Sequence, residues 1–412
     1  MSFLTKLIFL HLFLLFSPFE VAEVAEVAEV AEVAEVAEVA EVAEVAEEEE
    51  MLVTYHFEEM SDSIINISRD FFEQVVQPIL LEHFPAETKQ TAFGVFGYGS
   101  EALGLDDEYS RDHHWGVRID ALMPADVFEQ KREAMLATLA AHLPSSFQGH
   151  SLQEGHLAGA GLSPDSLPSF LKRTIGIDHV PNGYVEWLNM PEEDIIHVVN
   201  GEVWSDELGE FSKIRAQLQN YYPEPVRLRR IAHWCRYYSG MGTYALRRAL
   251  LRDNGYYANI TFSRALRWGV QLAFLLDKVY CPYDKWTMAY LDKLPRMAAK
   301  IRPIIDEAIS LKTGWERKLE LLDNLSDILD EALVADGIIQ PHPKFGVSPT
   351  SGYRLMEHAY AEIIQGLPEE VRPIVPLWDQ VYWESFHSEY VAGIPLETWT
   401  GLLQLKPIEK KD

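Results

Sequence analysis

The sequence predicts an α+β protein, in which a small mixed sheet with its covering helices precedes a region made only of helices. Three observations lead to this prediction. Short apolar stretches that end in glycine or alternate with polar residues occur before about residue 200. Beyond that position, long segments repeat apolar residues with the 3.6-residue period of a helix. A leader of different composition precedes both regions.

The leader, residues 1–50, combines two unusual segments. MSFLTKLIFLHLFLLF places a lysine before an apolar run, as a signal peptide does, but the run is short for a membrane span. Nine copies of Val-Ala-Glu fill residues 21–47, and a period of three produces neither a helical stripe nor a strand face. We therefore expect a disordered, low-complexity or signal-like leader and a cytoplasmic protein that folds from about Met51. Secretion is the alternative, if residues 1–20 act as a signal peptide.

The first half of the folded chain, residues 51–200, alternates helical and extended patterns. The expected elements are a helix over 61–84, strands over 91–99 and 113–123, a helix over 125–143, a loop over 145–169, a third strand within 179–190 and a helix or turn after it. Pro124 and Pro144 bound the helix over 125–143. This pattern, with few strands, predicts a small mixed sheet.

The second half, residues 201–412, is expected to form a helical bundle. Helical periodicity covers 211–222, 224–253, 260–280, 293–311, 315–337 and 354–367, and a loop is expected over 340–352. Arginines such as Arg227, Arg229 and Arg230 crowd one of these segments. They either line a cleft for an anionic substrate or pair with carboxylates on the helix surface.

Composition argues against a nucleic-acid-binding protein and against a disulfide-rich one. The net charge is −29, and the leader, with 13 Glu and one Lys, accounts for −12 of it. An acidic chain without a zinc-finger or helix-turn-helix pattern argues against a polynucleotide partner. Cys235 and Cys281 form no disulfide framework and no metal-binding spacing, so we expect buried free thiols in a reducing compartment.

One stretch carries the chemistry, FGYGSEALGLDDEYSRDHHWGVRID over residues 96–120. Gly99 and Ser100 end a strand, where backbone N–H groups of a turn can receive a phosphate. Asp112 and His114 stand two residues apart, so on a strand both would project from one face. Both residue types bind metal ions, although Mg²⁺ prefers oxygen and histidine suits softer metals. An ordinary turn is the competing interpretation.

The arrangement resembles the nucleotidyltransferase superfamily, whose pattern is Gly-Ser, a gap of this length, Asp-x-Asp and a third carboxylate on a later strand. The longer string YGSEALGLDDEYSRDHHWG resembles a domain-of-unknown-function family within that superfamily, with Gly-Ser-Glu before Ser-x-Asp-His-x-Trp-Gly. The resemblance extends through YCPYDKWTMAYLDKLPR and spans most of residues 60–390. It implies a nucleotidyltransferase-like first domain and a C-terminal bundle similar to that of kanamycin-nucleotidyltransferase-like proteins.

The resemblance assigns roles to particular residues. Gly99 and Ser100 would cradle the triphosphate, and Asp112 would be the first ligand of Mg²⁺ or Mn²⁺. His114 stands where the superfamily has its second Asp, and Glu186, on the expected third strand, is the candidate third carboxylate. Asp112, His114 and Glu186 thus form the expected catalytic and metal set.

Two basic residues complete the expected site. Arg118 is a candidate phosphate ligand, with a carboxylate partner as the alternative. Lys285, in CPYDKW between two helices, matches the superfamily's phosphate-holding basic residue from the helical domain.

The expected function is metal-dependent transfer of a nucleotidyl group from a nucleoside triphosphate to a small-molecule or protein acceptor. His114 leaves two alternatives. One is a degraded nucleotidyltransferase that binds or senses nucleotide without turnover. The other is a repurposed biosynthetic enzyme in which His114 helps to bind a transition metal.

Overall fold

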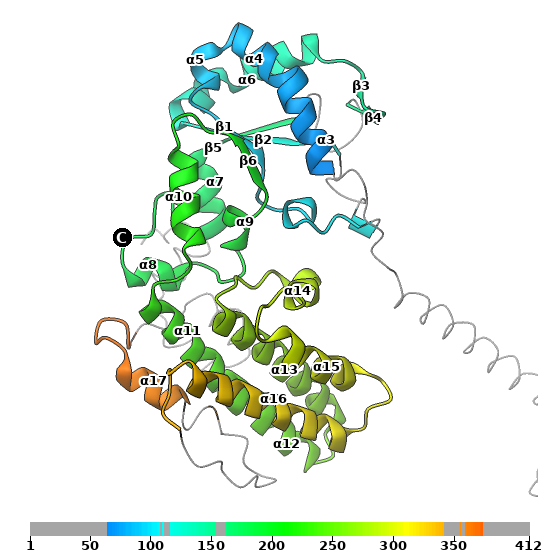
Figure 1. Cartoon of the computed structure of the whole chain (residues 1–412), viewed down its shortest axis with the longest axis vertical. Helices are drawn as coiled ribbons and strands as arrows, with labels where there is room; N and C mark the ends of the chain where they lie inside the picture. The colour runs from blue at the N-terminus through cyan, green and yellow to red at the C-terminus, as the bar shows by residue number, and fades with distance from the viewer. Residues whose placement is uncertain are drawn as a thin grey trace, which may run out of the picture. The chain divides into compact units, whose positions relative to one another are not determined.

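The central sheet of the computed structural model contains four strands in the order β5-β2-β1-β6 (Figure 1). These strands are β1 (Ala92–Val95), β2 (Ile119–Met123), β5 (Leu162–Ser166) and β6 (Glu202–Ser205). β1 pairs antiparallel with β2 and β6, whereas β2 and β5 run parallel. The sheet is therefore mixed, and an α+β fold is confirmed. The structure describes residues 64–107, 109–110, 116–152, 161–341, 355 and 359–373, so the leader and the predicted start near Met51 lie outside it.

Helices cover both faces of the sheet, because successive residues of a strand point to opposite sides. Phe93, Ile119 and Met123 pack into one apolar cluster with the helices that precede β1 and follow β2. Ala92 and Leu122 belong to a second cluster, which continues into the helical half. Figure 1 shows α4 and α6 over one face and α7 and α10 over the other. Both clusters bury the strands, and this burial stabilises the sheet.

The helices of the first half agree with the predictions before and after the first two strands. They are α3 (Ile64–Phe71), the π-helical turn η1 (Phe72–Val76), α4 (Gln77–His83), α5 (Pro85–Thr88), the 3₁₀ turn η2 (Glu101–Leu103), α6 (Ala125–His142), α7 (Leu167–Ile175), α8 (Tyr184–Asn189) and α9 (Ile196–Val199). The predicted helices over 61–84 and 125–143 are thus confirmed, as is the strand within 91–99.

Three predicted elements are wrong in part. Residues 113–115 of the strand predicted over 113–123 lie outside the described residues, and the described strand begins at Ile119, because Gly116 has a φ of +151° and bends the chain before it. The loop predicted over 145–169 contains β5 and the short antiparallel pair β3 (Ser146–Phe147) and β4 (His150–Ser151). β5 carries Pro164, which an edge strand tolerates because one side of its backbone has no strand to pair with.

The third strand predicted within 179–190 is the helix α8. Gly183 precedes it with a φ of +85°, and the carboxylate of Glu186 accepts a hydrogen bond of 2.6 Å from the backbone N–H of Asn182. This contact ties the Glu186 side chain to the backbone just before the N-cap residue Gly183 and so holds the start of the helix. Met190, before Pro191, is extended and ends the helix.

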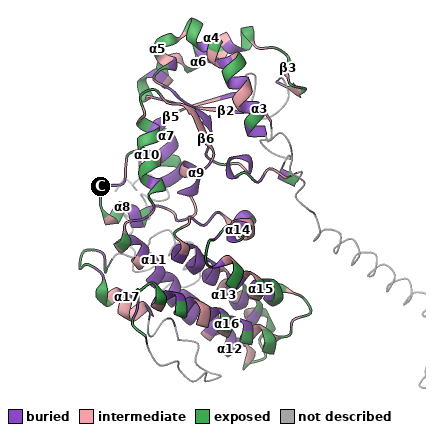
Figure 2. Cartoon of the chain, viewed as in Figure 1, coloured by how far each residue is buried: buried purple, intermediate pink, exposed green. Residues whose placement is uncertain are grey.

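The second half is helical, as predicted. Its elements are α10 (Glu210–Gln219), α11 (Glu224–Tyr237), the π-helical turn η4 (Tyr238–Tyr244), α12 (Ala245–Leu250), α13 (Gly255–Asp277), α14 (Asp284–Leu291), α15 (Ala298–Ile309), α16 (Trp315–Ala335) and α17 (Ala361–Gly366). Figure 2 shows buried residues along α11 and α13. Cys235 and Cys281 are buried free thiols, as expected.

Residues Asp62–Asp412 form one unit by their contacts, and the predicted division at residue 200 remains a prediction. In the part of the chain that the structure describes, no helix combines the length and apolar character needed to cross a bilayer.

Candidate functional site

The loop that follows β1 contains the first residues of the candidate site. Gly97 and Gly99 have φ angles of +80° and +138°, which L side chains rarely adopt. A Cβ atom on Gly99 would lie 2.5 Å from Oε1 of Glu101, so glycine is also required by space. Ser100 is buried and begins the turn η2, and its carbonyl oxygen accepts hydrogen bonds from the N–H groups of Leu103 and Leu105. The Gly-Ser pair therefore occupies the predicted turn after the first strand.

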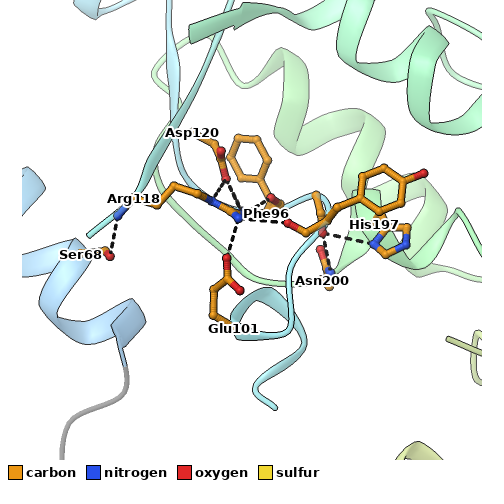
Figure 3. Close-up of polar contacts among 9 residues, drawn as sticks. Ser68, Phe96, Glu101, Arg118, Asp120, His197 and Asn200 are labelled. Carbon is orange, nitrogen blue, oxygen red and sulfur yellow. Dashed lines mark hydrogen bonds and ion pairs between the residues drawn. The ribbon is translucent and has the colours of Figure 1, made fainter. Parts of the chain in front are cut away.

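Arg118 holds this loop to β2 (Figure 3). Its guanidinium donates to the carboxylates of Glu101 (2.5 Å) and Asp120 (3.0 and 3.2 Å) and to the carbonyl oxygens of Phe96 (2.7 Å) and Tyr98 (3.0 Å). The Phe96 N–H in turn donates to Asp120 at 2.9 Å. Burial lowers the pKa of Arg118, but the neighbouring carboxylates outweigh this effect and raise it, so the side chain stays charged.

The role of Arg118 as a phosphate ligand stays a prediction, and in this structure its guanidinium is engaged within the protein. A guanidinium carries five N–H groups, and all five are used within the protein. The side chain is also 9% exposed, so no donor remains for a ligand. The alternative, a carboxylate partner, is what the structure contains. Glu101 and Asp120 are likewise engaged by this interaction.

Helix α9 supports the loop from its other side. His197 Nδ1 and Asn200 Nδ2 lie 3.2 and 3.1 Å from the carbonyl oxygen of Gly97, which accepts from both (Figure 3). The Gly97 N–H donates to the carbonyl oxygen of His197 at 3.0 Å. Burial lowers the pKa of His197 to about 4, so its imidazole is neutral at pH 7. The loop is thus held by a neutral network on this side.

Tyr98 lies between the two glycines and is 53% exposed. Its hydroxyl donates to Asp194 Oδ1 at 3.1 Å, and its ring centroid is 3.9 Å from that of His197. Burial and the Asp194 carboxylate raise the pKa of Tyr98, so the hydroxyl remains protonated and acts as the donor. The hydrogen bond to Asp194 therefore fixes the hydroxyl end of the Tyr98 side chain, and the contact with His197 fixes one face of its ring.

Lys285 of α14 meets the loop from the helical half. Its Nζ lies 3.3 Å from the hydroxyl oxygen of Ser110, while the side chain remains exposed. Asp107 fixes Ser110, since its Oδ1 accepts from the Ser110 N–H (2.8 Å) and hydroxyl (2.7 Å). Tyr290 of the same helix donates to the carbonyl oxygen of Leu103 at 3.3 Å. Lys285 thus reaches the segment that leads to Asp112.

Of the three expected metal ligands, the structure describes Glu186. Asp112 and His114 lie outside the described residues. Glu186 is on a helix instead of a strand, and its carboxylate pairs with His179 Nε2 at 3.1 Å. The strand alternation that suggested Glu186 is therefore absent. Across the residues that the structure covers, no three His, Cys, Asp or Glu side chains form a group that could hold a metal ion.

Two arginines of the helical half form hydrogen bonds that connect helices. Arg227 donates to Glu224 and to the carbonyl oxygen of Leu275, near the end of α13. Arg230 is fully buried and donates to the carbonyl oxygens of Trp187 and Met190, at the end of α8. Cations stabilise helix C-termini. These two arginines therefore join helices and do not face a substrate cleft.

Sequence reasoning missed several parts of this site, namely Asp120 and the support from Tyr98, Asp194, His197 and Asn200. One local signal was available, because Arg118 and Asp120 are two residues apart at the start of a strand and share a face. The contacts of α9 with the loop bridge about a hundred residues, and no local pattern marks them.

Comparison with known proteins adds three findings. Residues 187–287 match a family described as a domain of unknown function (DUF4037), and this match begins after the Gly-Ser and Asp112 motif. No curated protein sequence matches the chain. The chain is also similar to the crystal structure of a nucleotidyltransferase-like protein from Exiguobacterium sibiricum. That match has 14% identity, covers 77% of this chain and 92% of the other, and has a TM-score of 0.35.

Proposed function

We propose that this protein transfers a nucleotidyl group from a nucleoside triphosphate to a small-molecule or protein acceptor. The observation that supports the proposal most is the contact of Lys285 with Ser110, two residues before Asp112. A cation from the helical half thus contacts a residue that lies two positions before Asp112 in the sequence, in the loop that begins with the glycine turn after β1. Phosphoryl-type transfer needs this combination of cation, backbone turn and carboxylate.

Each residue has a definite task in the proposed reaction. Gly99 and Ser100 receive the triphosphate, and Lys285 donates hydrogen bonds to its oxygens. The acceptor's oxygen or nitrogen forms a bond to the α-phosphorus, the bond to the leaving pyrophosphate oxygen breaks, and Asp112 takes the acceptor's proton. A bound Mg²⁺ or Mn²⁺, held by Asp112 and His114, would neutralise charge on the phosphate oxygens. Arg118 and Glu186 are left out, because other side chains of the protein engage them.

We also propose that helices α10–α16 act as the C-terminal bundle of a kanamycin-nucleotidyltransferase-like protein. In this arrangement α14 supplies the basic side chain to the phosphate site. The net charge of −29 supports a small-molecule or protein acceptor over a polynucleotide.

Binding of nucleotide to the full chain tests the proposal. Thermal unfolding is measured with ATP, GTP, CTP or UTP and Mg²⁺ or Mn²⁺. A ligand at 100-fold excess over its Kd should stabilise the protein by about 2.7 kcal/mol. Asp112→Ala should abolish the metal-dependent part of this stabilisation, whereas Glu129→Gln, an exposed carboxylate on α6, should leave it intact. The absence of stabilisation by all four nucleotides with both metals would refute the proposal.

A second candidate function follows from His114, which stands where the superfamily has an Asp. Histidine contributes no negative charge to the site, so catalysis is expected to suffer more than binding. The protein would then sense nucleotide. Release of pyrophosphate distinguishes the two functions, since only the transferase produces it. Zinc or another transition metal in the purified protein would instead support the repurposed enzyme.

A further inference from the structure

The side chain of Tyr98 has an unusual setting for an exposed aromatic residue. It projects from the turn between Gly97 and Gly99, next to the proposed triphosphate site, and is 53% exposed. Exposed tyrosines on loops ordinarily change rotamer freely. This ring is instead held twice, by the hydrogen bond of its hydroxyl to Asp194 and by its stack on His197.

The support beneath the ring is itself rigid. His197 is 1% exposed, and its Nδ1 contacts the carbonyl oxygen of Gly97 at 3.2 Å. Its ring centroid lies 3.9 Å from that of Tyr98, with 32° between the planes. This contact covers one face of the Tyr98 ring. Because the side chain is 53% exposed, we take its accessible surface to include the face turned away from His197.

An aromatic face fixed beside a phosphate-binding turn suits one kind of ligand group. A nucleotide joins a planar base to its phosphates through a ribose, so a base lies near any bound triphosphate. Stacking of a base on an aromatic side chain contributes about 1–3 kcal/mol and tolerates every base. A ring that is already oriented loses little conformational entropy on binding.

We propose that the exposed face of Tyr98 is the stacking surface for the nucleobase of the substrate. This inference rests on the proposed function, because the phosphates at Gly99 and Ser100 bring the base to this place. Tyr98 is thus a substrate-binding residue that recognises the planar base in general. Selectivity among ATP, GTP, CTP and UTP is expected to be weak, because stacking uses no hydrogen-bond pattern of the base.

The decisive experiment compares ligands with and without a base on the full chain. Affinities for ATP, ribose 5-triphosphate and inorganic tripolyphosphate are measured by calorimetry with the same divalent metal. In the wild-type protein, removal of the base should weaken binding about tenfold. This comparison uses no variant, so it does not depend on the folding of one. Equal affinities for ATP and ribose 5-triphosphate would overturn the inference and leave the proposed function standing.

Variants then assign the effect to Tyr98. Tyr98→Leu, which keeps apolar bulk without a π face, should weaken ATP about tenfold and leave tripolyphosphate unchanged. Tyr98→Phe keeps the ring but loses the hydrogen bond to Asp194, so its loss should be smaller. Tyr256→Leu is the matched control, because Tyr256 is 81% exposed and lies at the start of α13.

Other outcomes separate the inference from the function on which it rests. Equal weakening of ATP and tripolyphosphate by Tyr98→Leu would show that Tyr98 only shapes the loop, and the inference would fail. ATP binding unchanged in Tyr98→Leu would also overturn it. If the wild-type protein bound neither ATP nor tripolyphosphate with any of the metals, the proposed function would fail, and the inference with it.

Discussion

Gly99 shows at the scale of one residue how space and backbone conformation combine. Its φ of +138° already excludes most side chains, and a Cβ atom would lie 2.5 Å from the Glu101 carboxylate. That carboxylate cannot move away freely, because Arg118 holds it at 2.5 Å. The loop conformation thus depends on the absence of a side chain here.

Replacement of this glycine should destabilise the protein measurably. We expect Gly99→Ala to lower the free energy of unfolding by roughly 1–3 kcal/mol, as strained backbone does. Gly104→Ala is the matched control, since Gly104 has a φ of +70° but no atom within 4 Å of the place that a Cβ atom would occupy. It should cost about 1 kcal/mol from backbone strain alone. Urea unfolding measures both, and equal losses would contradict the proposed clash.

His197 makes the stability depend on pH. Its pKa is about 4 in the folded protein, below the ordinary value of 6.5. As the pH falls below 6.5, the unfolded chain binds the proton first, so the contribution of His197 is present above pH 6.5 and lost towards pH 4. One pKa unit corresponds to about 1.4 kcal/mol, so we expect a loss of about 3 kcal/mol between pH 7 and pH 4.

A variant isolates this effect from other titrating groups. His197→Asn keeps an N–H that can donate to the carbonyl oxygen of Gly97 but does not titrate. Urea unfolding at pH 7, 5.5 and 4 should show a steeper fall for the wild-type protein than for the variant. Parallel curves would mean that His197 binds its proton at the same pH in the folded and the unfolded chain, which would contradict the lowered pKa.

At the scale of the element, the pair β1–β2 is joined by charge as well as by its backbone ladder. Arg118 precedes β2, and its partners come from the loop after β1 and from β2 itself. The carboxylates of Glu101 and Asp120 are thereby compensated. Removal of one partner from a buried ion pair of this kind strongly destabilises the fold, because the remaining charges stay buried without compensation.

Arg118→Met should therefore lower the free energy of unfolding by about 3–5 kcal/mol. The double variant Arg118→Met with Glu101→Gln should lose less, because one uncompensated charge disappears with the arginine. Arg132→Met on the surface of α6 serves as control, with an expected change of about 0–1 kcal/mol. Chemical denaturation distinguishes these outcomes, and a loss below that of the control would exclude the described role of Arg118.

At the scale of the whole molecule, the helical half contributes directly to the candidate site. Lys285 and Tyr290 of α14 contact the loop between β1 and β2, at Ser110 and Leu103. Arg230 of α11 binds the end of α8. The triphosphate site that we propose thus takes residues from both halves of the chain.

This arrangement predicts the effect of removing one cation. Lys285→Met should weaken ATP binding by roughly tenfold, the scale of one hydrogen bond from a charged donor. Lys300→Met, an exposed lysine on α15, should leave the affinity unchanged. Calorimetry measures both affinities, and equal values for wild-type protein and Lys285→Met would remove Lys285 from the site.

The sequence by itself determined the elements that local pattern specifies. Helical periodicity located α6, the helices from α10 to α13, and α15 and α16, and a glycine-ended apolar run located β1 and the turn at Gly99. Periodicity did not locate α14, which begins inside the segment CPYDKW, expected between two helices. The features that the sequence located follow from side chains close together in the chain, so a short window contains the information.

Only the tertiary structure decided which strands complete the sheet and which charges remain available. β5 and β6 are the edge strands of the sheet and pair with β2 and β1. Both strands are short and contain polar residues, and β5 also contains Pro164, so neither shows a clear strand pattern in the sequence. Glu186 lies on a helix, and the guanidinium of Arg118 donates all its hydrogen bonds to protein groups up to 22 residues away in the sequence. The physical reason is that hydrogen bonds between distant segments satisfy buried polar groups, and no local pattern records which partner a side chain finds.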